Sequence, residues 1–350
     1  MILEQRKLDH LHICLHEDVE FKGLTAGFEH YRLVHQALPD LSPADIDLHV
    51  DFLGHRLRAP LLISPMTGGT ATARQINRNL AAAAEALGLA MGVGSQRAAI
   101  EDPSLAPTYR VRDVAPHILL LANLGAVQLS YGYGLDQCRQ AVEMIDADAL
   151  FLHLNPLQEY LQGEGNRDFS GLLSKIEMLC RQLPVPVVAK EVGWGLSPQA
   201  VRALFDAGVA AVDVAGAGGT SWSRVERFRS SDEQTWRLAA VFDAWGIPTA
   251  EAIRGARAVA GPEAMIIGSG GIRSGLHVAK ALALGANLAG LALPLLRPAT
   301  VSAEAVAGHL SQLIAELALA AFATGSRNVE ALRHSPLVPA FPQPAETPGG

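Results

Sequence analysis

Several side chains that could take part in chemistry are concentrated in one short stretch, which contains His153, Asn155, Gln158 and Glu159. They come directly after the apolar run 149–152, which is typical of a strand buried in a parallel sheet. An imidazole can carry a proton, amides can form hydrogen bonds, and a carboxylate binds hard cations. Because ligands in α/β folds lie beyond the carboxyl ends of the strands, the stretch predicts part of a ligand site. An ordinary polar turn would have a similar composition.

Further polar or glycine-rich turns follow other apolar runs of the chain. Arg97 is a candidate anion clamp because a guanidinium matches phosphate oxygens, with a surface salt bridge as the alternative. Lys190 ends an apolar run, where burial is costly without a negative partner, so it suits an electron-rich flavin ring edge or a Schiff base. Glycine-rich turns late in the chain suit a bound phosphate. These turns span residues 65–70, 94–97, 123–126, 190–193, 216–222, 270–275 and 290–293.

The elements that must position these turns are eight short apolar segments that alternate with helical segments. Strict alternation predicts a parallel sheet, and eight units over this length predict an α/β TIM barrel in a single domain. An open doubly wound sheet is the alternative, but its glycine-rich first turn and later acidic residue are not found in convincing form. The predicted strands are 61–64, 90–94, 118–122, 149–154, 186–190, 211–215, 265–269 and 287–292. The predicted helices include 73–87, 136–145, 169–183, 198–207, 275–284 and the long amphipathic helix 302–323.

The composition limits the class of protein. The chain has 350 residues, of which 49% are hydrophobic and 18% charged, so it can bury a sizeable core. A formal net charge of -7 argues against nucleic acid as a partner. The three cysteines match no metal or redox spacing, the N-terminus has no signal-peptide core, and no uninterrupted apolar run reaches roughly 18 residues. We therefore expect a cytoplasmic protein that spans no membrane.

Outside the barrel, the two ends of the chain differ in character. Residues 1–58 are predicted to form an N-terminal arm and lead-in, polar and irregular over the first 40, with Arg6 and Lys7 near the front. These cations could reach an anionic ligand, although a frayed, solvated terminus is the alternative. The barrel is expected over 59–325, and a flexible tail rich in Pro, Gly and Ala over 326–350.

Together these segments resemble a known family, the type 2, flavin-dependent isopentenyl diphosphate isomerases. The glycine-rich turns are shared with other FMN-binding barrels, whereas the basic start, the Ser-Gln-Arg triplet and the His-x-Asn-x-x-Gln-Glu run are more specific. One departure is Ala215, where the family usually has a hydroxyl residue, and it removes one expected flavin contact. The matching segments are Arg6-Lys7-x-Asp9-His10, Met66-Thr67-Gly68-Gly69-Thr70, Gly94-Ser95-Gln96-Arg97, Asn123-Leu124-Gly125, His153 to Glu159, Lys190-Glu191-Val192-Gly193, Gly218 to Trp222 and Gly270-Gly271-Ile272-Arg273.

The resemblance implies an Mg²⁺-dependent FMN enzyme that interconverts isopentenyl and dimethylallyl diphosphate in isoprenoid biosynthesis. It also implies NADPH or NADH as reductant of the flavin, no net redox change, and a homotetramer or homo-octamer. The residues expected around FMN are Thr67, Gly68, Gly69, Ser95, Asn123, Lys190, Thr220, Gly271, Ile272, Arg273, Ala292 and Leu293. Those expected at the diphosphate are Arg6, Lys7, Ser95, Gln96, Arg97 and Gln158, with Glu159 on Mg²⁺. Those expected at the reacting carbons are His153, Asn155, Gln158 and Trp222.

The reaction moves a double bond by adding one proton and removing another. Flavin N5, Gln158 and His153 are all candidates for the acid–base group, and His153 is chemically the better base of the two side chains. One alternative is another FMN-dependent barrel of the 2-hydroxy acid oxidase type, which leaves the basic arm and Gln158-Glu159 unexplained. A catalytically idle flavin- or phosphate-binding barrel is the other, and it predicts gaps in the polar set, of which Ala215 is the single example.

Overall fold

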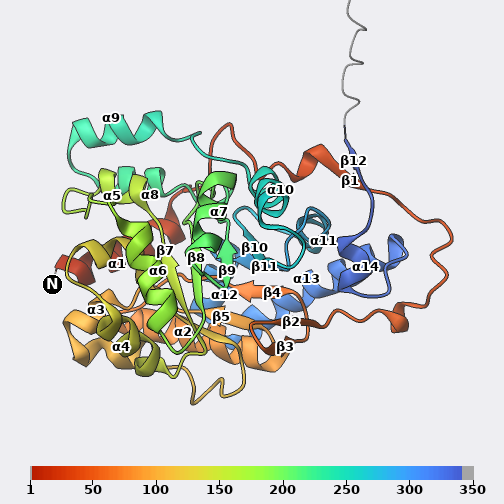
Figure 1. The fold of residues 1–350 in the computed structure, drawn as a ribbon, viewed down its shortest axis with the longest axis horizontal. Coiled ribbons are helices and arrows are strands. Elements are labelled where there is room, and N and C mark those ends of the chain that lie inside the picture. The colour runs from red at the N-terminus through yellow and green to blue at the C-terminus, as the bar shows by residue number, and fades with distance from the viewer. Residues whose placement is uncertain (1, 341–350) are drawn as a thin grey trace, which may run out of the picture.

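The computed structural model describes residues 2–340 and shows eight parallel strands closed into a barrel and surrounded by helices (Figure 1). The predicted TIM barrel is therefore confirmed. The third strand differs from its prediction, because it begins at Leu120 and continues through Asn123 to Gly125. The barrel strands are β4 (Leu61–Ile63), β5 (Ala90–Gly92), β6 (Leu120–Gly125), β7 (Ala149–His153), β8 (Val187–Lys190), β9 (Ala211–Asp213), β10 (Met265–Ser269) and β11 (Leu288–Leu291), and β11 pairs with β4.

Helices cover the outside of the barrel, and several begin at a hydroxyl side chain that accepts a backbone hydrogen bond. Thr70, Ser197, Ser274 and Ser302 cap their helices in this way, which satisfies an otherwise unpaired N–H group. The helices after the strands are α2 (Ala71–Leu87), α3 (Arg97–Glu101), α4 (Leu135–Ile145), α5 (Pro156–Leu161), α6 (Leu172–Gln182), α7 (Pro198–Asp206), α8 (Trp222–Arg229), α9 (Glu233–Val241), α10 (Thr249–Ala260), α11 (Gly275–Ala283), α12 (Leu293–Val301) and α13 (Ala303–Ala323). Short 3-10 helices lie at η1 (Phe28–His30), η2 (Pro43–Asp45), η3 (Pro103–Thr108) and η4 (Ala126–Ser130).

The barrel interior is built in layers, because every second side chain of a strand points inward. Each strand contributes one buried apolar or small residue to a packed layer: Leu62, Ala90, Leu121, Phe151, Val188, Ala211, Ile267 and Leu288. A hairpin of β2 (Val50–Phe52) and β3 (His55–Leu57) packs against this cluster through Phe52 and Leu57. The residues two positions further along each strand form the next layer: Ser64, Gly92, Asn123, His153, Lys190, Asp213, Ser269 and Gly290. This second group, the polar layer, forms the floor of the site.

The N-terminal arm is a helix, α1 (Ile2–His16), and the expectation of an irregular segment was wrong here. Its apolar residues Leu11 and Ile13 are buried, and it contacts α8 and α12. The chain then crosses the barrel mouth, where Phe21 N donates to Gly219 O (3.1 Å) and Ser221 N donates to Val19 O (2.8 Å). Tertiary packing therefore holds an arm whose local sequence has no clear helical pattern.

At the other end of the chain, α13 is long and apolar enough to cross a membrane by length and composition alone. It packs instead along α2, α11 and α12, with one face buried. Residues 326–340 also differ from the predicted flexible tail: they contain α14 (Val329–Arg333) and β12 (Leu337–Pro339), which pairs with β1 (Tyr31–Leu33). Residues 341–350 lie outside the described residues.

Candidate active site

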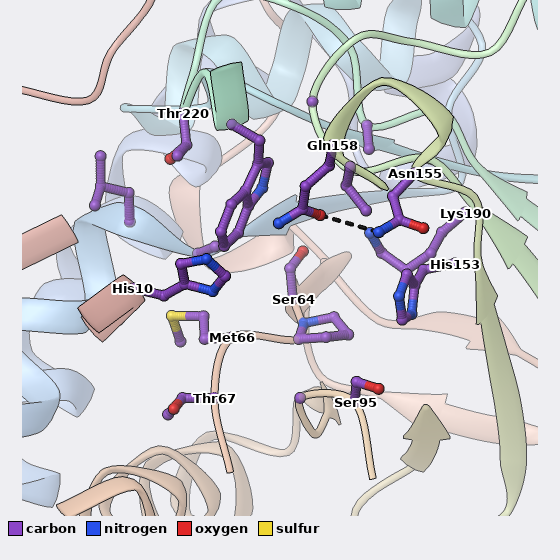
Figure 2. A pocket seen from close by; sticks show the side chains of 18 of the residues that line it. His10, Ser64, Met66, Thr67, Ser95, His153, Asn155, Gln158, Lys190 and Thr220 are labelled. Carbon is purple, nitrogen blue, oxygen red and sulfur yellow. Dashed lines mark hydrogen bonds between the residues drawn. The ribbon is translucent and has the colours of Figure 1, made fainter. Parts of the chain in front are cut away.

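A cavity of ≈ 260 Å³ lies at the carboxyl ends of the barrel strands, with α1 at its mouth. Turns after all eight strands contribute to its walls, as the arrangement of a TIM barrel requires. Figure 2 shows several of these side chains converging from the floor and from opposite walls. The sequence-predicted residues that line it are Arg6, Lys7, Thr67, Ser95, Arg97, Asn123, His153, Asn155, Gln158, Glu159, Lys190, Thr220, Trp222, Gly271, Ile272, Arg273, Ala292 and Leu293.

Three predicted site residues, Gly68, Gly69 and Gln96, are not among the residues that line the cavity. Gln96 is fully buried, with Oε1 accepting from Asn123 N (2.9 Å) and Nε2 donating to Ala141 O (2.7 Å). These two hydrogen bonds join the start of α3 to β6 and α4, and they leave the Gln96 side chain without access to a ligand in the cavity. The expected contact of Gln96 with the diphosphate is therefore corrected.

On the floor of the cavity, the ring of His153 is paired with Asn123. The His153 Nδ1 and Asn123 Oδ1 atoms are 2.8 Å apart, and Asn123 Nδ2 donates to Val93 O (3.0 Å). Because that amide nitrogen is already used, Asn123 Oδ1 accepts and His153 Nδ1 carries the hydrogen. Burial, reinforced by the charges of Lys190 and Lys7, lowers the pKa of His153 to about 3. The imidazole is therefore neutral at physiological pH.

One wall consists of three side chains on and beside α5 that share hydrogen bonds. Asn155 Nδ2 donates to Gln158 Oε1 and to Glu159 Oε1, both at 3.1 Å. Figure 2 shows the first of these bonds, with Gln158 facing Ser64 across the cavity. Gln158 Nε2 donates in turn to Glu226 Oε1 (3.1 Å), so both ends of the amide are oriented.

Glu226 on α8 organises this wall, and sequence reasoning missed it. Besides Gln158, its carboxylate binds His10 Nε2 (2.9 Å), Gln162 Nε2 (2.6 Å) and Arg229 Nε (2.8 Å). Burial raises the pKa of Glu226, but His10 and Arg229 outweigh that effect and lower it to about 2. The signal was its spacing: Glu226 lies four residues after Trp222, on the same face of the helix.

At the mouth, α1 brings two cations into the cavity wall. Lys7 Nζ donates to Ser95 O (2.8 Å) and to the Tyr109 hydroxyl, and Arg6 Nη1 donates to Gln162 Oε1 (2.9 Å). Burial, with a contribution from Arg6, lowers the pKa of Lys7 to about 7. Lys7 is held by neutral oxygens and forms no ion pair within residues 2–340, so an anion would be a favourable partner.

The opposite side of the cavity has the features that a flavin phosphate and ring require. Helix α12 begins at Leu293. Pro294 has no N–H and Leu295 N donates to Ala292 O (2.9 Å), so the Leu293 N–H is the donor that this terminus offers at the cavity wall. Lys190 is buried and reaches the cavity from the floor. The Ser64 hydroxyl is buried and has no hydrogen-bond partner among the described residues. A phosphate at the α12 terminus and a polar ring over the floor fit these donors.

The donors near Glu159 fit a hard cation bound together with a phosphate ligand. Glu159 is buried and lines the cavity, and Asn155 Oδ1 is a buried oxygen with no partner in the described part of the chain. Residues 2–340 contain no cluster of three or more His, Cys, Asp or Glu side chains that could hold a metal alone. Because Mg²⁺ is commonly bound by one or two carboxylates plus phosphate oxygens and water, a single carboxylate is sufficient.

Comparison with known proteins agrees with this geometry. The family model of FMN-dependent dehydrogenases matches residues 2–106 and 152–339. The chain is 53% identical over 332 residues to the isopentenyl-diphosphate delta-isomerase of Nostoc sp., covering 95% of each. It is 52% identical over 339 residues to that of Stutzerimonas stutzeri, covering 96% of this chain and 97% of the relative.

Solved structures of two oxidases share the fold. A mandelate oxidase with a monooxide FMN adduct aligns with a TM-score of 0.65 and 17% identity, covering 97% of this chain and 96% of the other. A lactate oxidase from Pediococcus acidilactici aligns with a TM-score of 0.64 and 17% identity, covering 91% and 88%. At such low identity these likenesses support the barrel alone. Sequence identity above one half over nearly the whole length decides the rest: the chain belongs to the FMN-dependent dehydrogenase family and, within it, to the isopentenyl-diphosphate delta-isomerases.

Proposed function

We propose that this protein interconverts isopentenyl and dimethylallyl diphosphate, using reduced FMN and Mg²⁺. The observation that carries the proposal is one cavity with two unlike halves. The floor and the α12 terminus suit a flavin, while Arg6, Lys7 and Arg97 bring three cations to the mouth beside Glu159. Three cations and a carboxylate suit a diphosphate with its Mg²⁺, whereas a 2-hydroxy acid carries a single negative charge at its carboxylate.

The residues of the mouth bind and orient the substrate in this proposal. Lys7 exchanges the neutral oxygens of Ser95 and Tyr109 for a phosphate. Arg97, which pairs with Glu101 (Nε–Oε1 2.7 Å), gives up that salt bridge to form a second charged contact. Glu159 would hold the Mg²⁺ that accompanies the diphosphate. Because Lys7 and Arg6 lie on the same helix, substrate binding also stabilises the position of α1.

The reacting carbons would lie between the floor and the wall of Asn155, Gln158 and Trp222. When bound, reduced FMN supplies proton exchange and stabilises positive charge at its N5 face. Gln158 is held by Asn155 and by Glu226, and we assign it to orienting the alkene and the departing proton. His153, with a pKa near 3, is a weak base and a poor cation, so we assign it to positioning through Asn123. Trp222 offers an aromatic face to developing positive charge.

The reductant, the oligomeric state and the compartment are proposed from the family resemblance. We propose that NADPH or NADH reduces the flavin, that the protein forms a homotetramer or homo-octamer, and that it works in the cytoplasm in isoprenoid biosynthesis. Neither the reductant nor the assembly alters the roles given above. A 2-hydroxy acid oxidase, the rival activity, transfers one electron pair from its substrate to O₂ in each turnover, whereas the isomerisation has no net redox change. Measuring O₂ consumed per product formed therefore distinguishes the two activities.

The decisive test is an assay on purified protein reconstituted with FMN. The protein is incubated with isopentenyl diphosphate, Mg²⁺ and dithionite, anaerobically and in air, and dimethylallyl diphosphate is quantified. We expect product only with reduced flavin, and no loss of reductant in proportion to product. Flavin binding without isomerisation, together with oxidation of lactate or mandelate, would contradict the proposal, and failure to bind FMN would remove its basis.

A further inference from the structure

The polar layer of the barrel contains a lysine and an aspartate, and they come from neighbouring strands. Lys190 ends β8, and its register partner on β9 is Asp213. Both residues follow a buried apolar residue of the packed layer by two positions, so both side chains point into the barrel. The third titratable member of the layer, His153, is neutral. Asp213, inside the barrel, is thus the strand neighbour of Lys190, which faces the proposed flavin site.

The surroundings of Asp213 are those of a fixed group that does not reach the ligand. Asp213 is completely buried and is not among the cavity-lining residues. Its Oδ1 accepts from Ser269 Oγ (2.6 Å) and from Ala215 N (3.2 Å). Its Oδ2 has no hydrogen-bond partner among residues 2–340. An unsatisfied buried oxygen is costly, and a redox or catalytic role is one of the reasons for which native structures retain such a group.

The positive charge of Lys190 offsets part of the cost of burying the Asp213 carboxylate. Burial raises the pKa of Asp213, and Lys190 acts against this effect more than Ser269 or the Ala215 amide. Lys190 Nζ itself donates to Glu191 O and forms no ion pair with Asp213 in the described chain. The two groups therefore interact through charge across the layer, in a medium where water does not screen them.

We propose that Asp213 acts on the cofactor through Lys190: its carboxylate moderates the positive charge that Lys190 presents and so lowers the reduction potential of bound FMN. The inference rests on the proposed place of the flavin above the polar layer. Reduction adds negative charge to the flavin, which Lys190 favours and the Asp213 carboxylate opposes. Removal of that carboxylate charge should therefore make bound FMN easier to reduce.

The test is a redox titration of D213N, S269A and wild type, each reconstituted with FMN, using dithionite and a reference dye. D213N keeps the shape and removes the charge, and we expect reduced FMN to gain at least tenfold in affinity relative to oxidised FMN, a potential higher by about 30 mV for a two-electron couple. S269A removes the hydrogen bond from Ser269 Oγ that favours the charged carboxylate but leaves the carboxylate itself in place, so the potential of its FMN should rise by a smaller amount. D148N removes a carboxylate at the other end of the barrel, beside Arg112, and its potential should equal that of wild type.

FMN content is measured first, by absorbance, because it distinguishes a failure of the proposed function from a failure of the proposed role of Asp213. Wild type without FMN would overturn the proposed function. FMN-loaded D213N or S269A with wild-type potential would overturn the role of Asp213 while leaving the proposed function intact. If D213N does not fold, S269A alone decides: an unchanged potential in FMN-loaded S269A refutes the inference. An equal rise in D148N would also refute it, because the effect would then come from net charge alone.

Discussion

The carboxylate of Glu226 is the point at which the arm, the wall and α8 meet, and its replacement by glutamine is the most informative single change. Its four partners are donors, three of them at Oε1 and Arg229 at Oε2. A glutamine keeps one oxygen as acceptor for His10, Gln158 and Gln162, but it presents an N–H₂ group, which cannot accept, to Arg229 Nε. E226Q therefore loses both the charge and one hydrogen bond while keeping the volume of the side chain.

The size of the effect follows from the pKa of Glu226. A shift from 4.5 to about 2 corresponds to about 3 kcal/mol of stability at neutral pH. The pKa is lower in the folded state, so this contribution is complete above about pH 4.5 and is lost as the pH falls toward 2. By about pH 4 roughly 1 kcal/mol of it should be gone. Because Gln158 loses a charged acceptor, we also expect kcat to fall about tenfold or more, since each tenfold costs about 1.4 kcal/mol.

Urea unfolding followed by circular dichroism, at pH 7 and pH 4, measures the stability, and the isomerase assay measures kcat. E177Q is the matched control, because Glu177 pairs with Arg181 on the exposed face of α6. An exposed pair of this kind contributes about 0.5 kcal/mol or less. If E226Q and E177Q lost equal stability at pH 7, the account of Glu226 as a buried organising anion would be refuted. A difference that did not shrink at pH 4 would refute the assignment of the effect to its charge.

Three positions in or near the cavity wall, Glu191, Lys7 and Gly94, give further expected outcomes. Burial raises the pKa of Glu191 to about 7 although four backbone N–H groups donate to it, so stability should fall as pH rises from 4.5 to 7, and E191Q should flatten this fall in urea titrations. Burial lowers the pKa of Lys7 to about 7, so KM should rise as pH passes 7 in wild type and show no such rise in K7M. A Cβ at Gly94 would lie 2.5 Å from Thr67 O, so G94A should lower the FMN content, whereas G163A has open space and should not.

The floor of the site could be predicted from the sequence because barrel strands have a simple period. Polar residues that end apolar runs, such as His153 and Lys190, are recognisable without a structure. The end of β6 was misplaced because Asn123 was read as the first residue after the strand. Pairing with β7 in fact continues as far as Gly125, opposite His153. A polar side chain does not end a strand when it points into a polar layer.

The errors at the mouth have a different cause. Ser95, Gln96 and Arg97 were predicted to bind together, but Gln96 lies in the turn that begins α3, where its side chain is directed to Ala141 O and Asn123 N inside the fold. Glu226 and Tyr109 approach the cavity from elements that pack only in the folded chain. Such tertiary contacts leave no local pattern in a single sequence.

This difference between floor and mouth also explains how one barrel can support reactions as unlike as oxidation and isomerisation. In the proposed function, residues of the polar layer act on the flavin, and residues carried by α1, α5 and α8 act on the substrate above it. If the division holds, the potential of FMN and the KM for the substrate can be changed independently. Changes at Asp213 or Ser269 should alter the potential of FMN more than KM, and changes at Lys7 should alter KM and leave the potential unchanged. A K7M protein with a shifted flavin potential would mean that the arm and the floor act as one electrostatic unit, and that substrate and cofactor cannot be assigned to separate layers of the same cavity.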